Sequence, residues 1–325
     1  MNANEITAVM LSDAQFMQSF IDEQVKAIQE AVGEGLAVNA LSGGVDSALV
    51  TMLGYKALGS WLKTYFVDSG LMRQDEPRQI VDIFQGLDIP VEIIDSEDIF
   101  LRNLEGLTDP EKKRNAVSMS FYRDVFGPLV RESGAKVLLH GTILTDVDET
   151  TAGIKRQHNI FTQLGIDPEE VFGYKILEPL VWLRKDGVRL VARELGLPDE
   201  IVNRQPFPGP GLATRIKGVV TKERAELVRQ ATVITEELLN PFKPFQTMTI
   251  LNEDRVTGIV DGKRSFGLQM EVRAWKSIDA RTAVPLIPSE DVLLELGRRI
   301  PAEVLGVVSA VYQISPKPPC TMEAY

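Results

Sequence analysis

The sequence predicts an α/β protein that consists of a doubly wound parallel sheet followed by a smaller α+β domain. Two observations predict this. Short apolar runs alternate with helical patterns between residues 13 and 195, and such alternation is typical of parallel sheets flanked by helices. A run dense in Pro and Gly at 204–212 ends this alternation, and beyond it strand patterns follow one another with few helices between them. A chain of 325 residues is long enough for two domains, which we place at 1–205 and 206–325.

Apolar spacing defines the elements of the first domain. We expect helices at 13–32, 46–57, 76–87, 111–133 and 185–195. We expect strands at 36–40, 62–67, 91–94, 135–140 and 174–180. Ligands of such sheets bind beyond the carboxyl ends of the strands, so the predicted site combines 42–47, 68–73 and 141–149. The polar stretch 143–175 shows no clean period and is expected to be an irregular lid or binding loop.

The second domain has a different pattern. Helices are expected at 221–239 and 288–303, and strands at 245–251, 255–260 and 270–277. Strands that follow one another with few helices between them indicate a small α+β domain.

The loop Ser42-Gly43-Gly44-Val45-Asp46-Ser47 lies between the first strand and the following helix. Glycines let the backbone approach an anion closely, while the hydroxyls, the loop N–H groups and the helix dipole favour phosphate oxygens. It is not a Walker A loop, because no Gly-Lys-Ser/Thr follows, and it lacks the glycine spacing of a dinucleotide fingerprint. The alternative interpretation is a Gly-Gly turn capped by Ser and Asp. It explains less well why two hydroxyl residues, two glycines and an aspartate occur within six residues.

The loop resembles the pyrophosphate loop of ATP pyrophosphatases, which cleave ATP between its α and β phosphates and activate a substrate as an adenylate. Further motifs make the chain similar to the ATP pyrophosphatase part of the GMP synthetase family, including its C-terminal dimerisation domain. They are Asp68-Ser69-Gly70-Leu71-Met72-Arg73, Gly106-Leu107-Thr108-Asp109-Pro110-Glu111-Lys112-Lys113-Arg114, Gly141-Thr142-Ile143, Ile154-Lys155, Lys185-Asp186, Phe207-Pro208-Gly209-Pro210-Gly211-Leu212 and Lys317-Pro318-Pro319.

This resemblance implies an adenine nucleotide α-hydrolase-like sheet and a ligase that aminates xanthosine 5′-monophosphate (XMP) to GMP through an O2-adenylyl intermediate. It implies ATP and Mg²⁺ as cofactors, with Asp46 as the metal ligand. The residues implied to bind ATP and pyrophosphate are Ser42, Gly43, Gly44, Val45, Asp46, Ser47, Val67, Asp68, Gly141 and Thr142. The implied catalytic residues are Lys185, Lys155, Asp146 and Glu149. The implied acceptor-binding residues are Arg204, Pro208, Gly209, Gly211, Lys317, Thr321 and Glu323. On sequence alone, Lys185 is equally well interpreted as a surface lysine, and Glu149 as a solvated loop acid.

The implied partners follow from what the chain lacks. Its one cysteine, Cys320, lies outside any glutaminase-type elbow. The resemblance therefore implies a separate glutamine amidotransferase subunit, or direct use of ammonia. It also implies a homodimer, because a small domain buries proportionally little surface and two-fold dimers are the commonest arrangement.

Departures from the family pattern lie on the acceptor side. Asp148 stands where the family has Ile, and the stretch after Lys155 lacks one histidine and two glycines of the family sequence. The acceptor is therefore XMP or a related nucleotide. Two alternatives stay open here: an ATP pyrophosphatase that adenylates another acceptor for amidation or sulfur transfer, and a non-catalytic nucleotide-binding module.

Bulk composition narrows the partners further. The net charge of −11 argues against nucleic-acid binding, which needs clustered Lys and Arg. No run approaches ~18 apolar residues, so no membrane span is expected. The start of the sequence lacks the features of a signal peptide, and one cysteine allows no internal disulfide. We expect a cytoplasmic protein.

Overall fold

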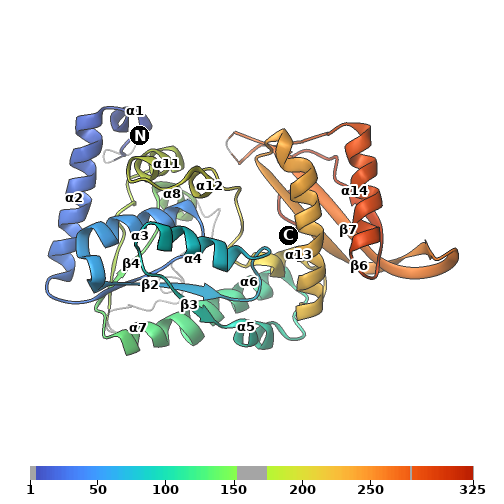
Figure 1. Cartoon of the computed structure of the whole chain (residues 1–325), viewed down its shortest axis with the longest axis horizontal. Helices are drawn as coiled ribbons and strands as arrows, with labels where there is room; N and C mark the ends of the chain where they lie inside the picture. Colours follow the sequence, from blue (N-terminus) through green and yellow to red (C-terminus); the bar gives the residue numbers. More distant parts are fainter. Residues whose placement is uncertain (1–4, 152–173, 279, 325) are drawn as a thin grey trace. The chain divides into compact units, whose positions relative to one another are not determined.

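The structure is a computed structural model that describes residues 5–151, 174–278 and 280–324 (Figure 1). It divides into two compact units, each of which collects segments from distant parts of the chain. The first, here the loop unit, comprises Met1–Val67, Pro77–Ile94 and Phe121–Arg204. The second, here the C-terminal unit, comprises Asp68–Glu76, Asp95–Ser120 and Gln205–Tyr325. The chain thus changes units next to the predicted boundary at 205, but two earlier segments also belong to the C-terminal unit.

The predicted parallel sheet is present and has the strand order β3-β2-β1-β4-β5. Its strands are β1 (Ala37–Ala40), β2 (Leu62–Asp68), β3 (Glu92–Asp95), β4 (Val137–Leu139) and β5 (Lys175–Leu177). β1 pairs in parallel with β2 and β4, and β4 pairs in parallel with β5. The order reverses at β1, so the loop after this strand lies at the switch point where such sheets bind ligands.

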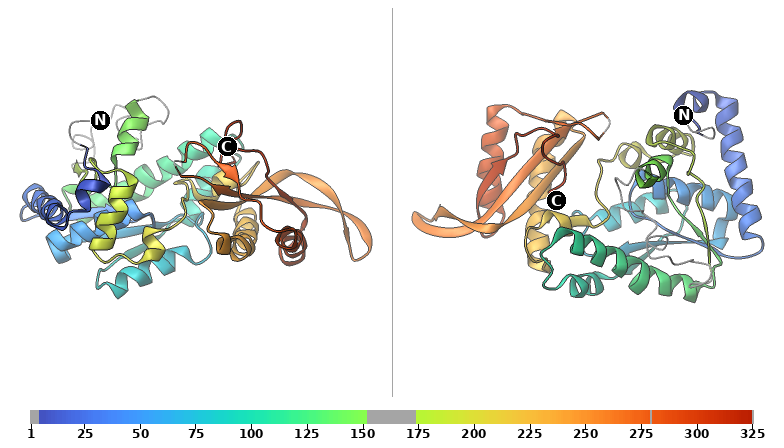
Figure 2. Two further views of the ribbon diagram at one scale, coloured as in Figure 1. Left: turned by 90° about the horizontal axis from the view of Figure 1, so that it is seen from above. Right: turned by 180° about the vertical axis from the view of Figure 1, so that it is seen from behind.

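Helices cover both faces of this sheet. Figures 1 and 2 show α3 (Val45–Leu58) and α4 (Glu76–Gly86) over one face and α7 (Gly127–Ser133) over the other. α2 (Ala14–Val32) and α11 (Lys185–Glu194) pack on α3. Further helices are α1 (Ala8–Leu11), α8 (Leu144–Thr151) and α12 (Asp199–Val202). The layered α/β fold predicted from the alternating pattern is therefore confirmed.

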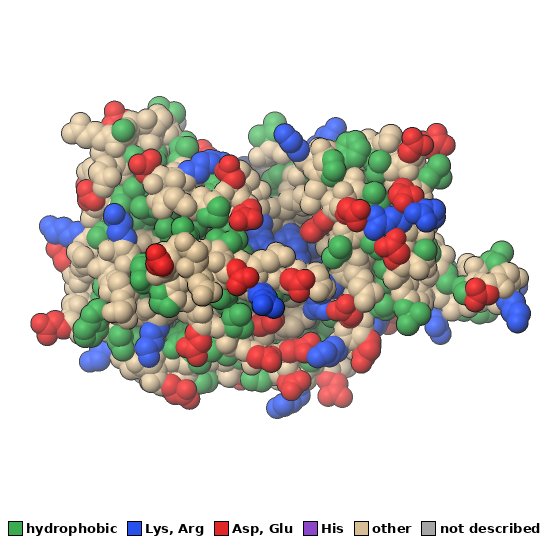
Figure 3. Space-filling view, viewed as in Figure 1, with side chains coloured by type: hydrophobic (Ala, Val, Ile, Leu, Met, Phe, Trp, Pro, Cys, Tyr) green, Lys and Arg blue, Asp and Glu red, His purple; other side chains and the backbone are tan. Residues whose placement is uncertain are grey.

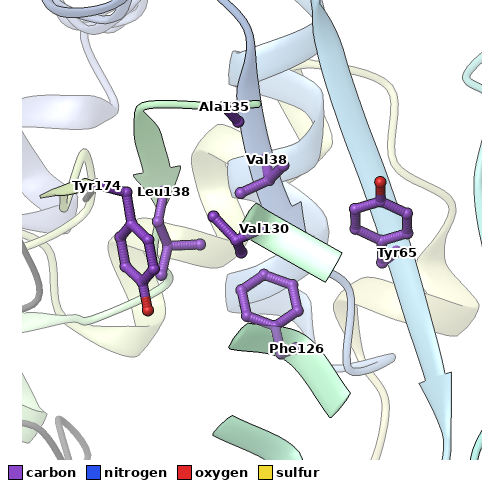
Figure 4. Close-up of a cluster of buried hydrophobic side chains, with 7 residues drawn as sticks. All are labelled: Val38, Tyr65, Phe126, Val130, Ala135, Leu138 and Tyr174. Atoms are coloured by element: carbon purple, nitrogen blue, oxygen red, sulfur yellow. The ribbon is translucent and has the colours of Figure 1, made fainter. Parts of the chain in front are cut away.

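One face of the sheet packs on a cluster of buried side chains (Figure 4). The cluster contains Val38, Tyr65, Phe126, Val130, Ala135, Leu138 and Tyr174. Tyr65 meets the ring of Phe126 edge-on at 6.5 Å between centroids. Burial of this apolar surface holds the strands and the α7 layer together at about 25 cal/mol for each Å² removed from water. The core thereby fixes the carboxyl ends of β1 and β4, where the loops of the site begin.

A buried polar bridge joins β1 to its neighbours. The Asn39 amide donates to Thr51 Oγ1 at 2.6 Å, and Thr64 Oγ1 donates to Asn39 Oδ1 at 2.7 Å. All three side chains are buried, and each finds a partner, as buried polar groups must. The bridge ties β1, β2 and α3 together just before the loop 42–47, which is predicted to bind phosphate and is here called the phosphate loop.

The C-terminal unit is built on a mixed sheet. Its strands are β6 (Gln246–Val260), β7 (Lys263–Lys276), β8 (Val284–Pro285) and β9 (Val307–Tyr312), and its helices include α5 (Glu97–Leu104), α6 (Pro110–Met119), α13 (Lys222–Leu239) and α14 (Glu290–Glu303). β6 and β7 pair antiparallel, while β7 and β9 pair in parallel. Figure 2 shows the distal part of the β6–β7 hairpin projecting from this unit. The predicted α+β character of this region is confirmed.

The outer side of α14 carries oppositely charged side chains next to one another, which Figure 3 shows as adjacent blue and red groups. Arg298 pairs with Glu295, and Arg299 with Glu303, at 2.6 Å in each case. Pairs three or four residues apart on a helix contribute only about 0.2–0.5 kcal/mol each. They mark a solvated face of this element.

Several predicted elements are wrong in detail. The single helix expected at 111–133 is three pieces, because a π-helical stretch Ser120–Phe126 separates α6 from α7. Pro128 in the first turn of α7 cannot supply the backbone N–H that a continuous helix needs. The strands expected at 245–251 and 255–260 are one strand with a register shift between Leu251 and Arg255. The short elements α1, α5, α12, β8 and β9 were not predicted.

The stretch expected to be irregular, 143–175, begins with α8, so that prediction is wrong for residues 144–151. Asp146 accepts a hydrogen bond from the N–H of Ile143 at 3.1 Å, which satisfies one of the free donors before the helix. The remainder of the predicted lid, including Lys155, lies outside the described residues. Among the helices that the structure describes, none combines the length and the apolar character that a membrane crossing requires.

Candidate active site

The phosphate loop forms the turn from β1 into α3. Gly43 adopts φ +77°, a region that favours glycine, and the loop is closed by hydroxyl contacts. Ser47 Oγ accepts from the N–H of Ser42 at 3.1 Å and lies 3.0 Å from Ser42 Oγ. Gly44 is the N-cap of α3 and makes no side-chain cap hydrogen bond. The first N–H groups of a helix need partners from outside it, so this end of α3 is suited to an anion.

Asp46 and Lys185 meet beside this loop. Lys185 Nζ donates to Asp46 Oδ2 at 2.6 Å, although the two residues are 139 positions apart. The other carboxylate oxygen, Asp46 Oδ1, is buried and has no hydrogen-bond partner among the described atoms. The structure therefore brings one predicted catalytic residue against the predicted metal ligand, and the catalytic role of Lys185 stays a prediction.

Gly141 packs directly against the same loop. A Cβ at this position would lie 3.3 Å from the backbone C of Asp46 and 3.3 Å from the N of Ser47. Contacts this close leave little room for a side chain, so the loop after β4 needs glycine here. Two predicted nucleotide-binding segments, 42–47 and 141–142, thus adjoin.

A chain of hydrogen bonds holds Thr142, the residue after Gly141, in place. Thr142 Oγ1 donates to Glu178 Oε1 at 2.6 Å and lies 2.7 Å from His140 Nδ1. His140 Nε2 lies 3.5 Å from the hydroxyl of Tyr122, whose pKa burial raises to about 12. The phenol therefore stays protonated across the physiological range, and a proton is always present at that end of the chain. His140, Glu178 and Tyr122 were not recognised in the sequence, because nothing there shows that the ends of β4 and β5 adjoin.

Arg204, which we expected on the acceptor side, contacts the phosphate loop. Its Nη1 donates to the carbonyl of Gly43 at 3.2 Å. It therefore contributes a positive charge beside the loop, and acceptor contact by this residue stays a prediction. Of the remaining predictions, Val67 is buried at the end of β2, and Glu149 belongs to α8.

In the C-terminal unit, the run 205–216 folds around a tight backbone contact. The N–H of Leu212 donates to the carbonyl of Leu71 at 2.8 Å. Gly211 has φ +59°, and a Cβ there would lie 2.3 Å from the same carbonyl oxygen. Gly209, by contrast, has nothing within 4 Å of such an atom. Glycine is therefore required at 211 by the close approach of two backbone segments, and not at 209.

Arg273 holds the backbone of the C-terminal residues 321–323, which include two predicted acceptor residues. Arg273 Nη1 donates to the carbonyls of Thr321, Met322 and Glu323, each at 3.0–3.1 Å. The Glu323 carboxylate accepts from Gln246 at 2.8 Å and from Arg215 at 3.3 Å. Lys317 is turned to another partner, since its Nζ donates to the carbonyl of Ala280 at 2.8 Å. Glu323 and Lys317 are therefore not brought together by any contact in the structure.

Two arginines that were not predicted from the sequence as acceptor residues lie against the ring of Phe207. The guanidinium carbons of Arg73 and Arg215 lie 4.4 Å and 4.7 Å from the centre of its ring. Arg215 is fully buried, and its Nε and Nη1 have no hydrogen-bond partner among the described atoms. Burial of unpaired charged donors is costly, so this cluster has capacity for an anionic or polar ligand, or for ordered water.

Comparison with known proteins gives consistent results over nearly the whole chain. The family described as GMP synthase C terminal domain matches residues 239–324. The B subunit of glutamine-hydrolyzing GMP synthase from Archaeoglobus fulgidus is 43% identical over 307 residues, which cover 94% of this chain and 99% of the relative. The proteins of the same name from Methanoregula boonei and Methanocaldococcus jannaschii are 44% and 41% identical, each over 94% of this chain and 98% of the relative.

The chain belongs to the family of GMP synthase B subunits. Among solved structures, NMN synthetase from Francisella tularensis is similar to 60% of this chain and 76% of its own, with a TM-score of 0.46 and 16% identity. That likeness is too low to support a statement about function.

The described residues suit a Mg²⁺ ion that takes most of its ligands from substrate and water and few from the protein. They contain no group of three or more His, Cys, Asp or Glu side chains that could hold a metal ion alone. Mg²⁺ commonly uses one or two carboxylates together with phosphate oxygens and water. The buried, unpaired Oδ1 of Asp46 at the phosphate loop provides such a carboxylate oxygen.

Proposed function

We propose that this protein is a ligase that converts XMP to GMP, using ATP and ammonia and releasing AMP and pyrophosphate. The observation that carries the proposal is the contact between Lys185 and Asp46 at the complete phosphate loop, in a chain about 40% identical to named GMP synthase B subunits over nearly its whole length. Adenylation of another acceptor has no comparable support.

In the first step, the O2 oxygen of XMP attacks the α-phosphorus of ATP and pyrophosphate leaves. We infer that Ser42, Ser47 and the N-terminus of α3 bind the departing phosphates through hydroxyl and N–H donors. Lys185 neutralises charge that develops on them, after exchanging its contact with Asp46 for a phosphate oxygen. Such donors act by positioning and electrostatic stabilisation, not by covalent chemistry.

Mg²⁺, when bound with ATP, would further neutralise the phosphates, and Asp46 is the residue that would hold it. Val67, Asp68, Gly141 and Thr142 would border the adenosine. Lys155, Asp146 and Glu149 stay candidates for charge neutralisation or for handling the ammonia proton. Of these, Asp146 already has a structural partner, the N–H of Ile143.

In the second step, ammonia attacks C2 of the adenylated base, AMP leaves and GMP remains. We propose that the acceptor binds in the C-terminal unit, where Arg73 and Arg215 flank Phe207 and where Glu323 has one buried, unpaired oxygen, Oε2. Guanidinium groups suit the phosphate of a nucleoside monophosphate, and a carboxylate suits N–H groups of a purine. Pro208, Gly209, Gly211, Lys317 and Thr321 complete the proposed acceptor set of this unit. Arg204, at the end of the loop unit, stays a predicted acceptor residue.

The test measures GMP and pyrophosphate in mixtures of ammonium, Mg²⁺, ATP and XMP. We expect the two products in equal amounts. We expect at least about a hundredfold lower rate for Ser47→Ala, because that change removes the three contacts that the Ser47 hydroxyl makes with Ser42 and Gly44 within the loop. Pyrophosphate released with another acceptor and none with XMP would overturn the proposed substrate. ATP binding without turnover on any acceptor would overturn the ligase.

The partner, the assembly and the location are part of the same proposal. The names of the relatives describe one subunit of a glutamine-hydrolyzing enzyme. We infer that a separate glutamine amidotransferase subunit supplies ammonia, that the protein works in the cytoplasm, and that residues 206–325 form the larger part of a dimerisation and nucleotide-binding domain. Glutamine is then expected to support GMP formation only after that subunit is added, whereas ammonium supports it with this chain alone.

A further inference from the structure

Three segments of the loop unit meet at the short stretch that precedes Lys185. The N–H of Ile6 donates to the carbonyl of Trp182 at 3.0 Å, and Ile6 forms a parallel bridge with Leu183. From another direction, the N–H of Leu144 donates to the carbonyl of Leu183 at 2.9 Å. The backbone just before α11 is thus held by residues from 5–7 and by the start of α8.

Arg184 makes the corresponding side-chain contacts. Its Nε donates to Glu5 at 2.7 Å and its Nη2 donates to Asp148 of α8 at 2.9 Å. Arg184 is also the N-cap residue of α11, with extended backbone and no side-chain cap hydrogen bond. Its side chain is therefore used entirely for contacts with two other segments, directly next to Lys185.

Helix α1 adds an apolar contact in the first turn of α11. A Cβ at Gly187 would lie 3.1 Å from Leu11 Cδ1, so Leu11 sits closely on the helix surface that glycine leaves open. α1 and α11 lie side by side in Figure 1 and are in contact. Leu11 and Leu183 are almost fully buried, so this apolar contact is part of the core beneath the start of α11.

We propose that residues Glu5–Leu11, together with Asp148, form a brace that acts through Arg184 to position Lys185 against Asp46 at the phosphate loop. The proposal rests on the proposed role of Lys185 in the reaction. It assigns support of the active site to the segment before the first large helix and to the carboxylate of Asp148 in α8. Glu5, Asp148 and Arg184 are positioning residues and need not touch any substrate.

The exposure of these groups indicates what the brace does. The side chains of Arg184 and Asp148 are 41% and 43% exposed, and an ion pair that exposed contributes little to folding stability. Glu5, the other partner of Arg184, is 13% exposed. The value of these contacts is geometric, because Lys185 Nζ must remain within hydrogen-bond distance of the loop. A misplacement of about 1 Å in such a group can cost on the order of 100-fold in rate.

The test compares Arg184→Gln with a matched control, Arg193→Gln. Arg193 is on the same helix, is 45% exposed and also contacts a carboxylate, Asp199, but it lies outside the brace. We expect Arg184→Gln to lower kcat for pyrophosphate release about tenfold, with KM for ATP within about twofold of the wild type. We expect Arg193→Gln to keep the wild-type kcat and the same melting temperature as Arg184→Gln.

A second set of variants tests whether the brace acts as a unit. Asp148→Asn should lower kcat by itself, yet reduce it by no more than about twofold when added to Arg184→Gln, because contacting residues are not additive. Arg184→Lys should restore part of the loss, since an ammonium can contact only one carboxylate well at a time. Equal kcat for Arg184→Gln and Arg193→Gln would overturn the proposal. A loss of kcat fully accounted for by unfolded protein would overturn it as well.

A readout that needs no acceptor separates this proposal from the proposed function. Competitive amine labelling followed by mass spectrometry measures the reactivity of Lys185 in the full-length protein without nucleotide. We expect several-fold faster labelling of Lys185 in Arg184→Gln than in Arg193→Gln, because its ammonium is held less firmly by Asp46. Equal labelling overturns the brace even if XMP is aminated. Faster labelling supports it even if XMP is not the acceptor.

Discussion

At the scale of single residues, the contact between Lys185 and Asp46 is the central feature of this protein. The lysine begins α11 and the aspartate lies in the first turn of α3, so the pair joins the two helices at the carboxyl end of the sheet. It places a lysine beside the loop that we propose binds the phosphates of ATP, in a chain whose net charge is −11. The positive charge is therefore local, as an acidic ATP-binding protein requires.

Replacement of this lysine tests its role. We expect Lys185→Met to lower kcat for pyrophosphate release by at least about a hundredfold, because the variant loses charge neutralisation in the transition state and leaves Asp46 without its partner. Steady-state kinetics with ATP as the varied substrate measures it. The exposed Lys56, in the last turn of α3, gives the control variant Lys56→Met. Similar rates for the two variants would contradict the role assigned to Lys185.

Lys113 has a structural role, unlike the one proposed for Lys185. It is a fully buried lysine in the C-terminal unit. Its Nζ donates to the carbonyl of Ile216 at 2.6 Å, which ties α6 to the end of the 205–216 run. Burial, together with the nearby charge of Arg224, lowers the pKa of Lys113 to about 8. The unfolded chain, in which the pKa is near 10.5, therefore binds more protons than the folded chain between these two pH values.

This difference makes stability depend on pH with a defined sign. Between pH 7 and 9.5 the Lys113 contribution should raise the free energy of unfolding by roughly 2 kcal/mol, since proton release favours the folded state in this window. Urea unfolding of the wild type and of Lys113→Met across this range measures it. The wild type should gain stability relative to the variant as the pH rises. The exposed neighbour Lys112, as Lys112→Met, should show no such trend.

At the scale of elements, the turn into the 3-10 helix Gly211–Arg215 depends on one backbone approach. Gly211→Ala would place a methyl group 2.3 Å from the carbonyl oxygen of Leu71 and would also strain a backbone with φ +59°. We expect a loss of about 2 kcal/mol or more in the free energy of unfolding. We also expect a raised KM for XMP with little change in KM for ATP.

Gly209→Ala is the matched control for the stability part of that prediction, because Gly209 lies in the same run, has no positive φ, and has open space where a Cβ would be. Denaturant unfolding of the two variants gives the comparison, and steady-state kinetics of Gly211→Ala against the wild type gives the KM values. If both variants unfold at the same denaturant concentration, the close approach of Leu71 to Gly211 is not what holds this run in place.

Individual elements show how far sequence patterns reach. Sequence patterns predicted α2, α3, α4, α11, α13 and α14 within a few residues. Most of these helices present an apolar stripe to the core of their own unit, whereas α3 is apolar on nearly all sides and is buried along most of its length. The patterns predicted a single helix at 111–133, where a π-helical stretch and Pro128 interrupt the hydrogen bonds. They also gave no sign of α8, whose eight residues are mostly polar and whose start is capped by Asp146.

At the scale of the whole molecule, the chain alternates between the two units, and each unit consists of three separate segments. Segments 68–76 and 95–120, which precede the last strands of the parallel sheet in sequence, belong to the C-terminal unit. Motifs that sequence order assigns to the first domain therefore fold with the second. Arg73, which lies in the motif after β2, packs on Phe207 in this way.

The dimer is the prediction that belongs to this scale. The C-terminal unit exposes Ile259, Phe266, Ile287 and Ile314, at 58–78% of their accessible area. Exposed apolar side chains favour self-association where they form one continuous surface, and the homodimer stays a prediction. Light scattering coupled to gel filtration should give twice the chain mass of 36.0 kDa. A mass of one chain at micromolar concentration would contradict the homodimer.

The sequence by itself determined the phosphate loop, the alternation that gives the parallel sheet, and the motifs that resemble the GMP synthetase family. These depend on residues close together in the chain, where local backbone geometry and periodicity decide the outcome. Only the tertiary structure decided which distant side chains meet: Lys185 with Asp46, Arg184 with Glu5 and Asp148, and Arg204 with the phosphate loop. The physical reason is that such contacts are set by the packing of helices on the sheet, which no local pattern specifies.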